Sequence, residues 1–138
     1  MKIAIIDGQG GRIGQMIVSA IKQAELPCQL HAIGTNSTAT AAMMKAGADA
    51  GATGENPVIV ACRDADVIIG PLGILVADAL MGEITPKMAV AVGQSKAIKL
   101  LLPLNLCQNL VVGTQTMSVS RLINETVTVL KDLILREA

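Results

Sequence analysis

The 138-residue sequence contains no phenylalanine, tyrosine or tryptophan. Without aromatic rings the chain cannot form the base-stacking surfaces of single-strand nucleic-acid binders or the aromatic belts of membrane proteins. Charged residues are also few, at 16% of the sequence, and 11 Lys and Arg balance 11 Asp and Glu. A strongly basic nucleic-acid-binding surface is therefore excluded. The 51% content of hydrophobic residues excludes an intrinsically disordered chain.

Cysteine is scarce as well. Cys28, Cys62 and Cys107 are odd in number and lack CxxC spacing, so we expect reduced thiols, no disulfide framework and no metal site. The apolar run at residues 3–6 is too short for a secretory signal. The uncharged stretch at residues 100–120 is interrupted by proline and polar side chains, so it does not predict a membrane-spanning helix. These features predict a cytoplasmic protein without nucleic-acid or membrane partners.

Short apolar runs alternate with segments of helical periodicity along the chain. Strands are predicted at residues 2–6, 29–33, 49–53, 66–70, 99–102 and 110–112. Helices are predicted at residues 13–24, 38–46, 58–63, 74–81, 86–92 and 119–134. This alternation indicates an α/β fold with a doubly wound, Rossmann-like parallel sheet and helices on both of its faces. The length fits a single nucleotide-binding domain over residues 1–138, with no room for a second, substrate-binding domain.

A glycine-rich turn follows the first strand, with the sequence Gly8-Gln9-Gly10-Gly11-Arg12-Ile13-Gly14. Its G-x-x-G-x-x-G spacing between a strand and a helix is the context of dinucleotide-binding turns. Glycine lets the N–H groups of a helix N-terminus approach a phosphate, whose charge the helix dipole favours. The turn therefore predicts a phosphate-bearing ligand, and a tight connection without ligand is the alternative. Replacement of Gly11 by a β-branched residue is expected to abolish nucleotide binding and leave the fold largely intact.

Other glycine and polar residues lie at the ends of the remaining strands, and the carboxyl ends of parallel strands meet at one edge of a sheet. Asp7, at the end of the first strand, has two interpretations. It accepts hydrogen bonds from the loop's own N–H groups, or it positions a ribose hydroxyl or a water-bound cation. The predicted cofactor-binding residues are Asp7, Gly8, Gly10, Gly11, Arg12, Ile13, Gly14, Gly34, Thr35, Asn36 and Gly70. The sequence does not single out a catalytic residue.

The second strand bears on the choice between NAD and NADP. NAD-binding proteins normally place an Asp or Glu at the end of this strand, where it binds the ribose hydroxyls. Here the strand is followed by Gly34-Thr35-Asn36-Ser37-Thr38, which is neutral and also lacks an Arg for the 2′-phosphate of NADP. Because hydroxyl and amide donors can bind a phosphate, we expect a dinucleotide ligand to be NADP at least as readily as NAD. A mononucleotide that does not reach this strand end is the alternative.

Two resemblances to known families extend these expectations. Residues 3–16 resemble the NAD(P)H-binding motif of dihydrodipicolinate reductase, with Gly10-Gly11-Arg12 and the closing Gly14 in common. That resemblance implies that Gly8, Gly11, Arg12, Ile13 and Gly14 line a pyrophosphate. The reductase carries its catalytic residues on a second domain, which we do not expect here. The whole chain also resembles short Rossmann-like bacterial proteins grouped as a family of unknown function, through the glycine turn and residues 34–36, 54–56, 66–73 and 82–86.

Three functions are consistent with these features. The first is a binding protein for a nucleotide or dinucleotide. The second is an NAD(P)-dependent oxidoreductase whose substrate site is completed by another subunit of a homo-oligomer. The third is a structural or assembly protein whose glycine turn is empty. We also expect self-association, because the few charged residues cannot cover the surface, and Val129 and Leu135 broaden the apolar face of the final helix.

Overall fold

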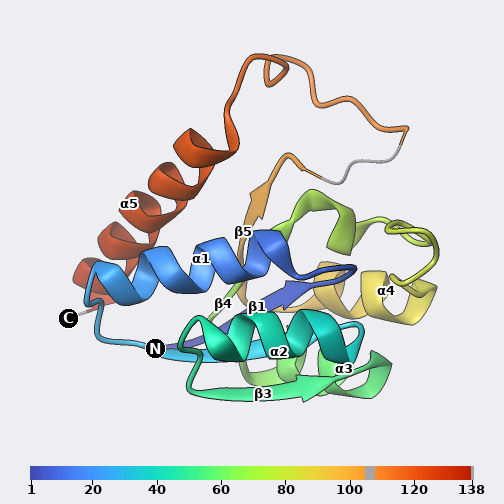
Figure 1. Ribbon diagram of the computed structural model, residues 1–138, viewed down its shortest axis with the longest axis horizontal. Coiled ribbons are helices and arrows are strands. Elements are labelled where there is room, and N and C mark those ends of the chain that lie inside the picture. The colour runs from blue at the N-terminus through green and yellow to red at the C-terminus, as the bar shows by residue number, and fades with distance from the viewer. Residues whose placement is uncertain (105–107, 138) are drawn as a thin grey trace.

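The computed structural model describes residues 1–104 and 108–137. These residues form one parallel sheet of five strands in the order β3-β2-β1-β4-β5 (Figure 1). The elements along the chain are β1 (Lys2–Asp7), α1 (Arg12–Gln23), β2 (Gln29–Gly34), α2 (Ser37–Lys45), β3 (Ala50–Thr53), α3 (Glu55–Asp64), β4 (Val67–Pro71), the 3₁₀ helix η1 (Leu72–Leu75), α4 (Pro86–Gln94), β5 (Ile98–Leu102) and α5 (Val119–Glu137). After β1, the chain adds β2 and β3 on one side of β1, and it then crosses over and adds β4 and β5 on the other side. This doubly wound order confirms the predicted Rossmann-like α/β fold.

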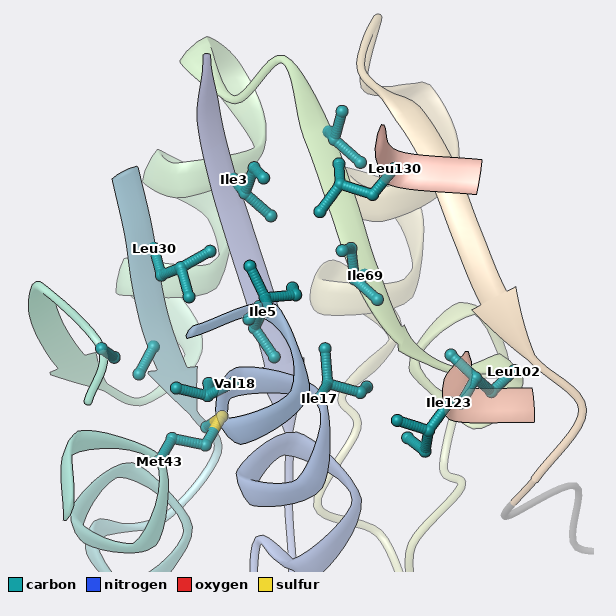
Figure 2. Close-up of a cluster of buried hydrophobic side chains, with 14 of the residues drawn as sticks. Ile3, Ile5, Ile17, Val18, Leu30, Met43, Ile69, Leu102, Ile123 and Leu130 are labelled. Carbon is teal, nitrogen blue, oxygen red and sulfur yellow. The ribbon is translucent and has the colours of Figure 1, made fainter. Parts of the chain in front are cut away.

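The helices cover both faces of the sheet because alternate residues of each strand point to opposite sides. In β1, Ile3 and Ile5 belong to one hydrophobic cluster, whereas Ala4 and Ile6 belong to the other. The first cluster joins the sheet to α1, α2 and α5 through Ile17, Val18, Ile21, Met43, Leu122, Ile123 and Leu130 (Figure 2). The second joins it to α3 and α4 through Val58, Ala61, Cys62, Met88, Ala89 and Val92. Burial on both faces explains the near-continuous apolar sequences of β1 and β4.

Side-chain hydrogen bonds fix where two of the helices begin. Asn36 precedes α2, and its Oδ1 accepts the N–H of Ala39 at 2.9 Å. Thr85 precedes α4, and its hydroxyl accepts the N–H of Met88 at 3.2 Å. Pro86 is the first residue of the helix. Proline is favourable at this position because the N–H group that it lacks would have no acceptor within the helix. Both helices therefore start at positions that the sequence specifies locally.

Residues 110–112 are not a strand, in contrast to the prediction. The side chains of Leu110 and Val112 are 82% and 92% exposed. Among the described residues, no strand pairs with residues 110–112. The last strand, β5, pairs with β4 on one side, and its other side is the edge of the sheet. Without a neighbouring strand, the backbone N–H and C=O groups of an apolar segment have no ladder partners, so its strand conformation is not stabilised.

The helix predicted at residues 74–81 is also wrong. The chain forms the short η1 helix after β4 and then continues in turns up to α4. Asp78, Leu80 and Met81 have φ values of 65°, 57° and 56°, which are incompatible with a right-handed helix. This segment of turns lies at the carboxyl end of the sheet, so its side chains belong to the same edge as the glycine turn.

No helix in residues 1–104 or 108–137 combines the length and apolar character needed to cross a membrane. Cys28 and Cys62 are free cysteines, whereas Cys107 lies outside the described residues. Burial raises the pKa of Cys62 to about 11, although the charge of Lys99 lowers it slightly. The Cys62 thiol is therefore protonated at neutral pH and behaves as a small apolar side chain of the core.

Candidate functional site

Three glycines of the turn, Gly8, Gly11 and Gly14, are buried. A Cβ atom at Gly11 would lie 2.6 Å from the Cα of Ala39 in α2, and Gly11 also has a φ of 70°. A Cβ atom at Gly14 would lie 2.5 Å from the Sδ of Met43. These glycines allow α1 to pack closely on α2. These contacts argue against the expectation that a β-branched residue at Gly11 leaves the fold largely intact.

Gly10 differs from the other glycines of the turn. A Cβ atom at this position would meet no heavy atom within 4 Å. Gln9, Gly10 and Arg12 are exposed, and Ile13 is half-buried. The outer surface of the turn, at the start of α1, is therefore accessible to a ligand at Gly10, where packing does not require glycine.

Asp7 lies beneath the turn and is only 1% exposed. Its Oδ1 accepts the N–H of Gly8 at 2.8 Å, and its Oδ2 accepts the N–H of Gly14 at 2.7 Å. Burial raises the pKa of Asp7, and the hydrogen bonds from Gly14 and Gly8 offset part of this rise. Of the two interpretations of Asp7, the structure contains the first, because the carboxylate binds the N–H groups of its own turn and holds both ends of it.

A carboxylate from a distant part of the chain lies at the end of β2. Oε1 of Glu83 accepts hydrogen bonds from Oγ1 of Thr35 and Nδ2 of Asn36, each at 2.7 Å. The same oxygen accepts the N–H of Gln9 in the glycine turn at 3.0 Å. A Cβ atom at Gly8 would lie 3.1 Å from it. One oxygen of Glu83 therefore connects the glycine turn to the end of β2.

The second oxygen of Glu83, Oε2, is available to a ligand. It accepts no hydrogen bond from the described residues. Because no fully buried side-chain nitrogen or oxygen of the described residues lacks a partner, Oε2 is at least partly accessible to solvent. Partial burial raises the pKa of Glu83, but the hydrogen bonds from Thr35, Gln9 and Asn36 outweigh burial and hold this pKa below its usual value. Glu83 thus presents a negative charge beside the glycine turn at neutral pH.

The segment that carries Glu83 is held in an uncommon conformation. It contains four residues with positive φ: Asp78, Leu80, Met81 and Gly82. Each non-glycine residue in this region costs about 1–2 kcal/mol. Leu80 and Ile84, on either side of Glu83, are 3% and 1% exposed and pack in the cluster under α3 and α4. Burial of these two side chains stabilises the turn, so the position of Glu83 is fixed by the core.

Glu83 was not among the predicted site residues. It lies 48 residues from Thr35 in the sequence, whereas the prediction considered only the residues that directly follow the second strand. The available signal was an acidic residue next to Gly82, between a buried strand and a helix that begins at Pro86. Connections that leave the carboxyl end of a parallel strand lie at the ligand-binding edge of the sheet.

Gly34 and Gly70 lie at the same edge but are buried. A Cβ atom at Gly34 would lie 2.6 Å from the backbone nitrogen of Thr40 in α2. A Cβ atom at Gly70 would overlap the carbonyl oxygen of Ile6 and lie 2.9 Å from Cδ1 of Ile74. In this structure both glycines serve the close approach of neighbouring elements.

Three cavities lie away from the glycine turn. One of about 660 Å³ lies between α3 and α4, one of about 460 Å³ lies between β5 and α5, and one of about 400 Å³ lies between α1 and α5. None of these three is lined by residues 7–14. Within the part of the chain that the structure describes, no group of three or more His, Cys, Asp or Glu side chains is placed to hold a metal ion.

Comparisons with known proteins place the chain in a family. A search of curated proteins found no match. Among solved structures, the chain is similar to a dodecameric FMN-dependent UbiX-like decarboxylase from Escherichia coli O157:H7, with 12% sequence identity and a TM-score of 0.44 over 96% of this chain and 94% of that chain. Similarity at this level gives no indication of function. The profile of DUF3842, a domain of unknown function, matches residues 2–135, and the chain therefore belongs to the DUF3842 family.

Proposed function

We propose that this protein binds a phosphate-bearing nucleotide at the glycine turn. The observation that supports this function is the position of the turn, which joins β1 to α1 where the strand order divides between β1 and β4. In open α/β sheets, ligands bind beyond the carboxyl ends of the strands at this point. The N-terminus of the 12-residue helix α1 favours an anionic group through its N–H groups and its dipole.

The proposed site has a phosphate side and a ribose side. Gly10, Arg12 and Ile13 form the phosphate side, at the accessible start of α1. The Arg12 guanidinium forms no ion pair within the described residues, so its charge is free to bind a phosphate. Thr35 and Asn36 form the ribose side, at the end of β2. This is a binding function, and it requires no reaction.

Substitutions of Gly10 test the proposed site without disturbing the fold. We expect the wild-type protein to bind at least one of NADH, NADPH and ATP in calorimetric titrations. Gly10→Ala should weaken binding, and Gly10→Val should weaken it at least tenfold, because each adds atoms where a phosphate would lie. The midpoint of thermal unfolding should stay within about 2 °C, since a Cβ atom here meets no heavy atom within 4 Å.

Two outcomes would contradict the proposal. If the wild-type protein binds none of the three nucleotides, the glycine turn is empty and the interpretation as a structural protein is favoured. If Gly10→Val binds as tightly as the wild type, the nucleotide lies elsewhere. Turnover of NADH or NADPH by the bound protein would add an oxidoreductase activity to the binding function.

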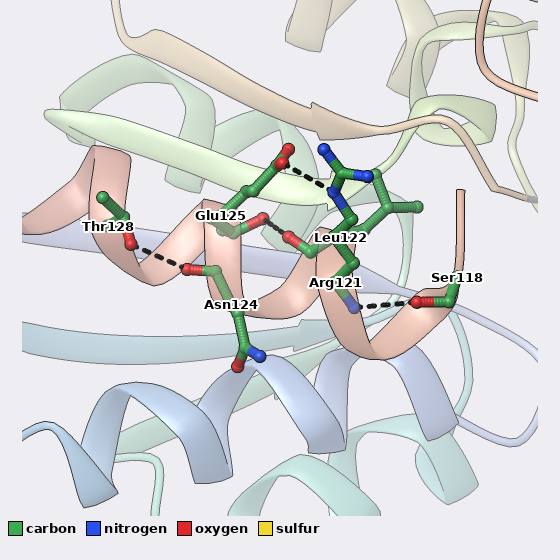
Figure 3. A network of polar contacts seen from close by, with 7 residues as sticks. Ser118, Arg121, Leu122, Asn124, Glu125 and Thr128 are labelled. Carbon is green, nitrogen blue, oxygen red and sulfur yellow. Dashed lines mark hydrogen bonds and ion pairs between the residues drawn. The ribbon is translucent and has the colours of Figure 1, made fainter. Parts of the chain in front are cut away.

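We also propose that the protein self-associates through α5. The outer surface of this helix carries polar contacts, among them the ion pair of Arg121 and Glu125 and the hydrogen bond from Thr128 to the carbonyl of Asn124 (Figure 3). Two apolar side chains lie on the same helix, with Val129 44% and Leu135 61% exposed. A second copy of the chain would remove this apolar surface from water, as in most homo-oligomers.

Light scattering tests self-association directly. The wild-type protein is expected to be a dimer or larger at high micromolar concentration. Replacement of both Val129 and Leu135 by lysine should give a monomer, because two charges cannot be buried without partners. Val60→Lys is the matched control, since Val60 is also 44% exposed but lies on α3. A monomeric wild type, or a control that dissociates as readily as the α5 variant, would contradict this interface.

A further inference from the structure

We infer that Glu83 selects a nucleotide with free 2′- and 3′-hydroxyls on its ribose, such as NAD, over one with a 2′-phosphate, such as NADP. This inference rests on the nucleotide-binding function proposed above. It reverses the preference expected from the sequence, in which the end of the second strand is neutral. In the structure that end is not neutral, because the Glu83 carboxylate lies 2.7 Å from both Thr35 Oγ1 and Asn36 Nδ2.

The carboxylate takes the place of an acid at the end of β2. In NAD-binding sheets, an Asp or Glu there accepts hydrogen bonds from the ribose hydroxyls. Here the same position is reached from the other side, by the segment between β4 and α4. Oε1 of Glu83 already accepts three hydrogen bonds, from Thr35, Asn36 and Gln9. Oε2 accepts none from the described residues and is at least partly accessible, so it is free to accept a ribose hydroxyl.

The charge of Glu83 decides which ribose is tolerated. A hydroxyl that donates to a carboxylate forms a charge-assisted hydrogen bond, which is stronger than one between neutral groups. A 2′-phosphate at the same place would bring a second negative group against the carboxylate. The side chains of Thr35 and Asn36 cannot compensate, because the Thr35 hydroxyl and one N–H of the Asn36 amide donate to Glu83, and the second N–H of that amide donates to the carbonyl oxygen of Gln9 at 2.9 Å. Two of the donors that made NADP plausible from the sequence, those of Thr35 and Asn36, therefore hold the carboxylate that repels its 2′-phosphate.

Glu83→Gln separates the charge of Glu83 from its structural role. The amide oxygen of glutamine can still accept hydrogen bonds at the position of Oε1 through its two lone pairs, so most of the connection between the glycine turn and β2 is retained. In place of Oε2 the amide presents an NH₂ group, which repels no phosphate and donates to one. The substitution thus removes the selecting group and leaves the surrounding geometry in place.

The experiment compares the dissociation constants of NAD and NADP for three proteins by calorimetry. The wild type is expected to bind NAD at least tenfold more tightly than NADP, a difference of about 1.4 kcal/mol. In Glu83→Gln this ratio should fall to threefold or less, or reverse. Glu125→Gln is the control, because Glu125 is an exposed glutamate on α5 that pairs with Arg121. Its ratio should equal that of the wild type.

The ratio of the NADP and NAD dissociation constants shows whether the selection by Glu83 fails alone or together with the proposed nucleotide-binding function. If neither dinucleotide binds any of the proteins, the proposed function and the inference both fail. If both bind, and Gly10→Val removes binding, but the wild type shows no preference for NAD, the function stands and selection by Glu83 is overturned. A preference for NAD that is the same in Glu83→Gln as in the wild type also overturns it. Because a ratio is compared, a general weakening of the site by the substitution does not change the conclusion.

Discussion

Replacement of Gly11 by valine is expected to lower the free energy of unfolding by about 3–5 kcal/mol. Gly11 has a φ of 70°, a conformation in which a β-branched residue is strained. Its Cβ would also lie 2.6 Å from the Cα and 2.8 Å from the carbonyl oxygen of Ala39, so α2 would have to move away from α1. A loss of this size is a large part of the stability of a small domain, which is about 5–15 kcal/mol.

The neighbouring glycine provides the control for this experiment. Gly10→Val introduces the same side chain one residue away, where its Cβ meets no heavy atom within 4 Å, and should change the free energy of unfolding by about 0.5 kcal/mol or less. Urea unfolding is best followed by far-UV circular dichroism, because the chain has no aromatic residue to report on tertiary structure. Equal stability of the two variants would show that the packing of α1 on α2 does not require glycine at position 11.

Asp7→Ala is expected to destabilise the protein by about 2–6 kcal/mol, because it leaves two buried N–H groups without an acceptor at about 1–3 kcal/mol each. These are the N–H groups of Gly8 and Gly14. Asp66→Ala is the matched control. Asp66 also accepts a backbone N–H, that of Lys2 at 2.6 Å, but it is exposed, so water can replace it. A loss for Asp7→Ala no larger than for Asp66→Ala would contradict the structural role of Asp7.

The effect of Asp7 should also depend on pH in a defined direction. Because burial raises the pKa of Asp7, the native state holds this proton more tightly than the unfolded chain does. The titration of Asp7 therefore favours the native state below its ordinary pKa, and this contribution is lost as the pH rises through the raised pKa. The stability difference between wild type and Asp7→Ala should be largest at acidic pH and narrow as the pH rises. A difference that widens over this range would show that hydrogen bonding, and not burial, dominates the pKa.

Much of the fold was predictable because the strands carry their own signals. β1 and β4 are apolar on both faces, and α1 shows the periodicity of a helix that buries one side, with Ile17, Val18 and Ile21 all buried. The errors fall where a local pattern is not enough. The apolar residues 110–112 lack a neighbouring strand, and the segment after η1 turns through positive φ values that no local pattern of Asp78, Leu80 or Met81 specifies.

The candidate site was also only partly predictable from the sequence. The glycine turn was recognisable because its spacing and its position after a strand are features of contiguous sequence. The individual roles of its glycines were not, since only the packing of α2 shows why Gly11 and Gly14 lack side chains and Gly10 has no such constraint. Glu83 was missed because its contacts with Gln9 and Thr35 join segments 74 and 48 residues apart. The negative charge of Glu83 changes the expected ligand from NADP to NAD, although Glu83 belongs neither to the glycine turn nor to β2.

The central position of β1 has a consequence for the chain while it is being synthesised. β1 pairs with β2 on one edge and with β4 on the other, so that Ile3 lies opposite both Leu30 and Val67. When the ribosome has completed β3 at Thr53, the second edge of β1 has no partner, and the face that α3 and α4 will cover is still open. At about 5–20 residues per second, this interval lasts on the order of seconds. The nascent chain therefore exposes one edge of the largely apolar strand β1 to chaperones and to other nascent chains until β4 emerges.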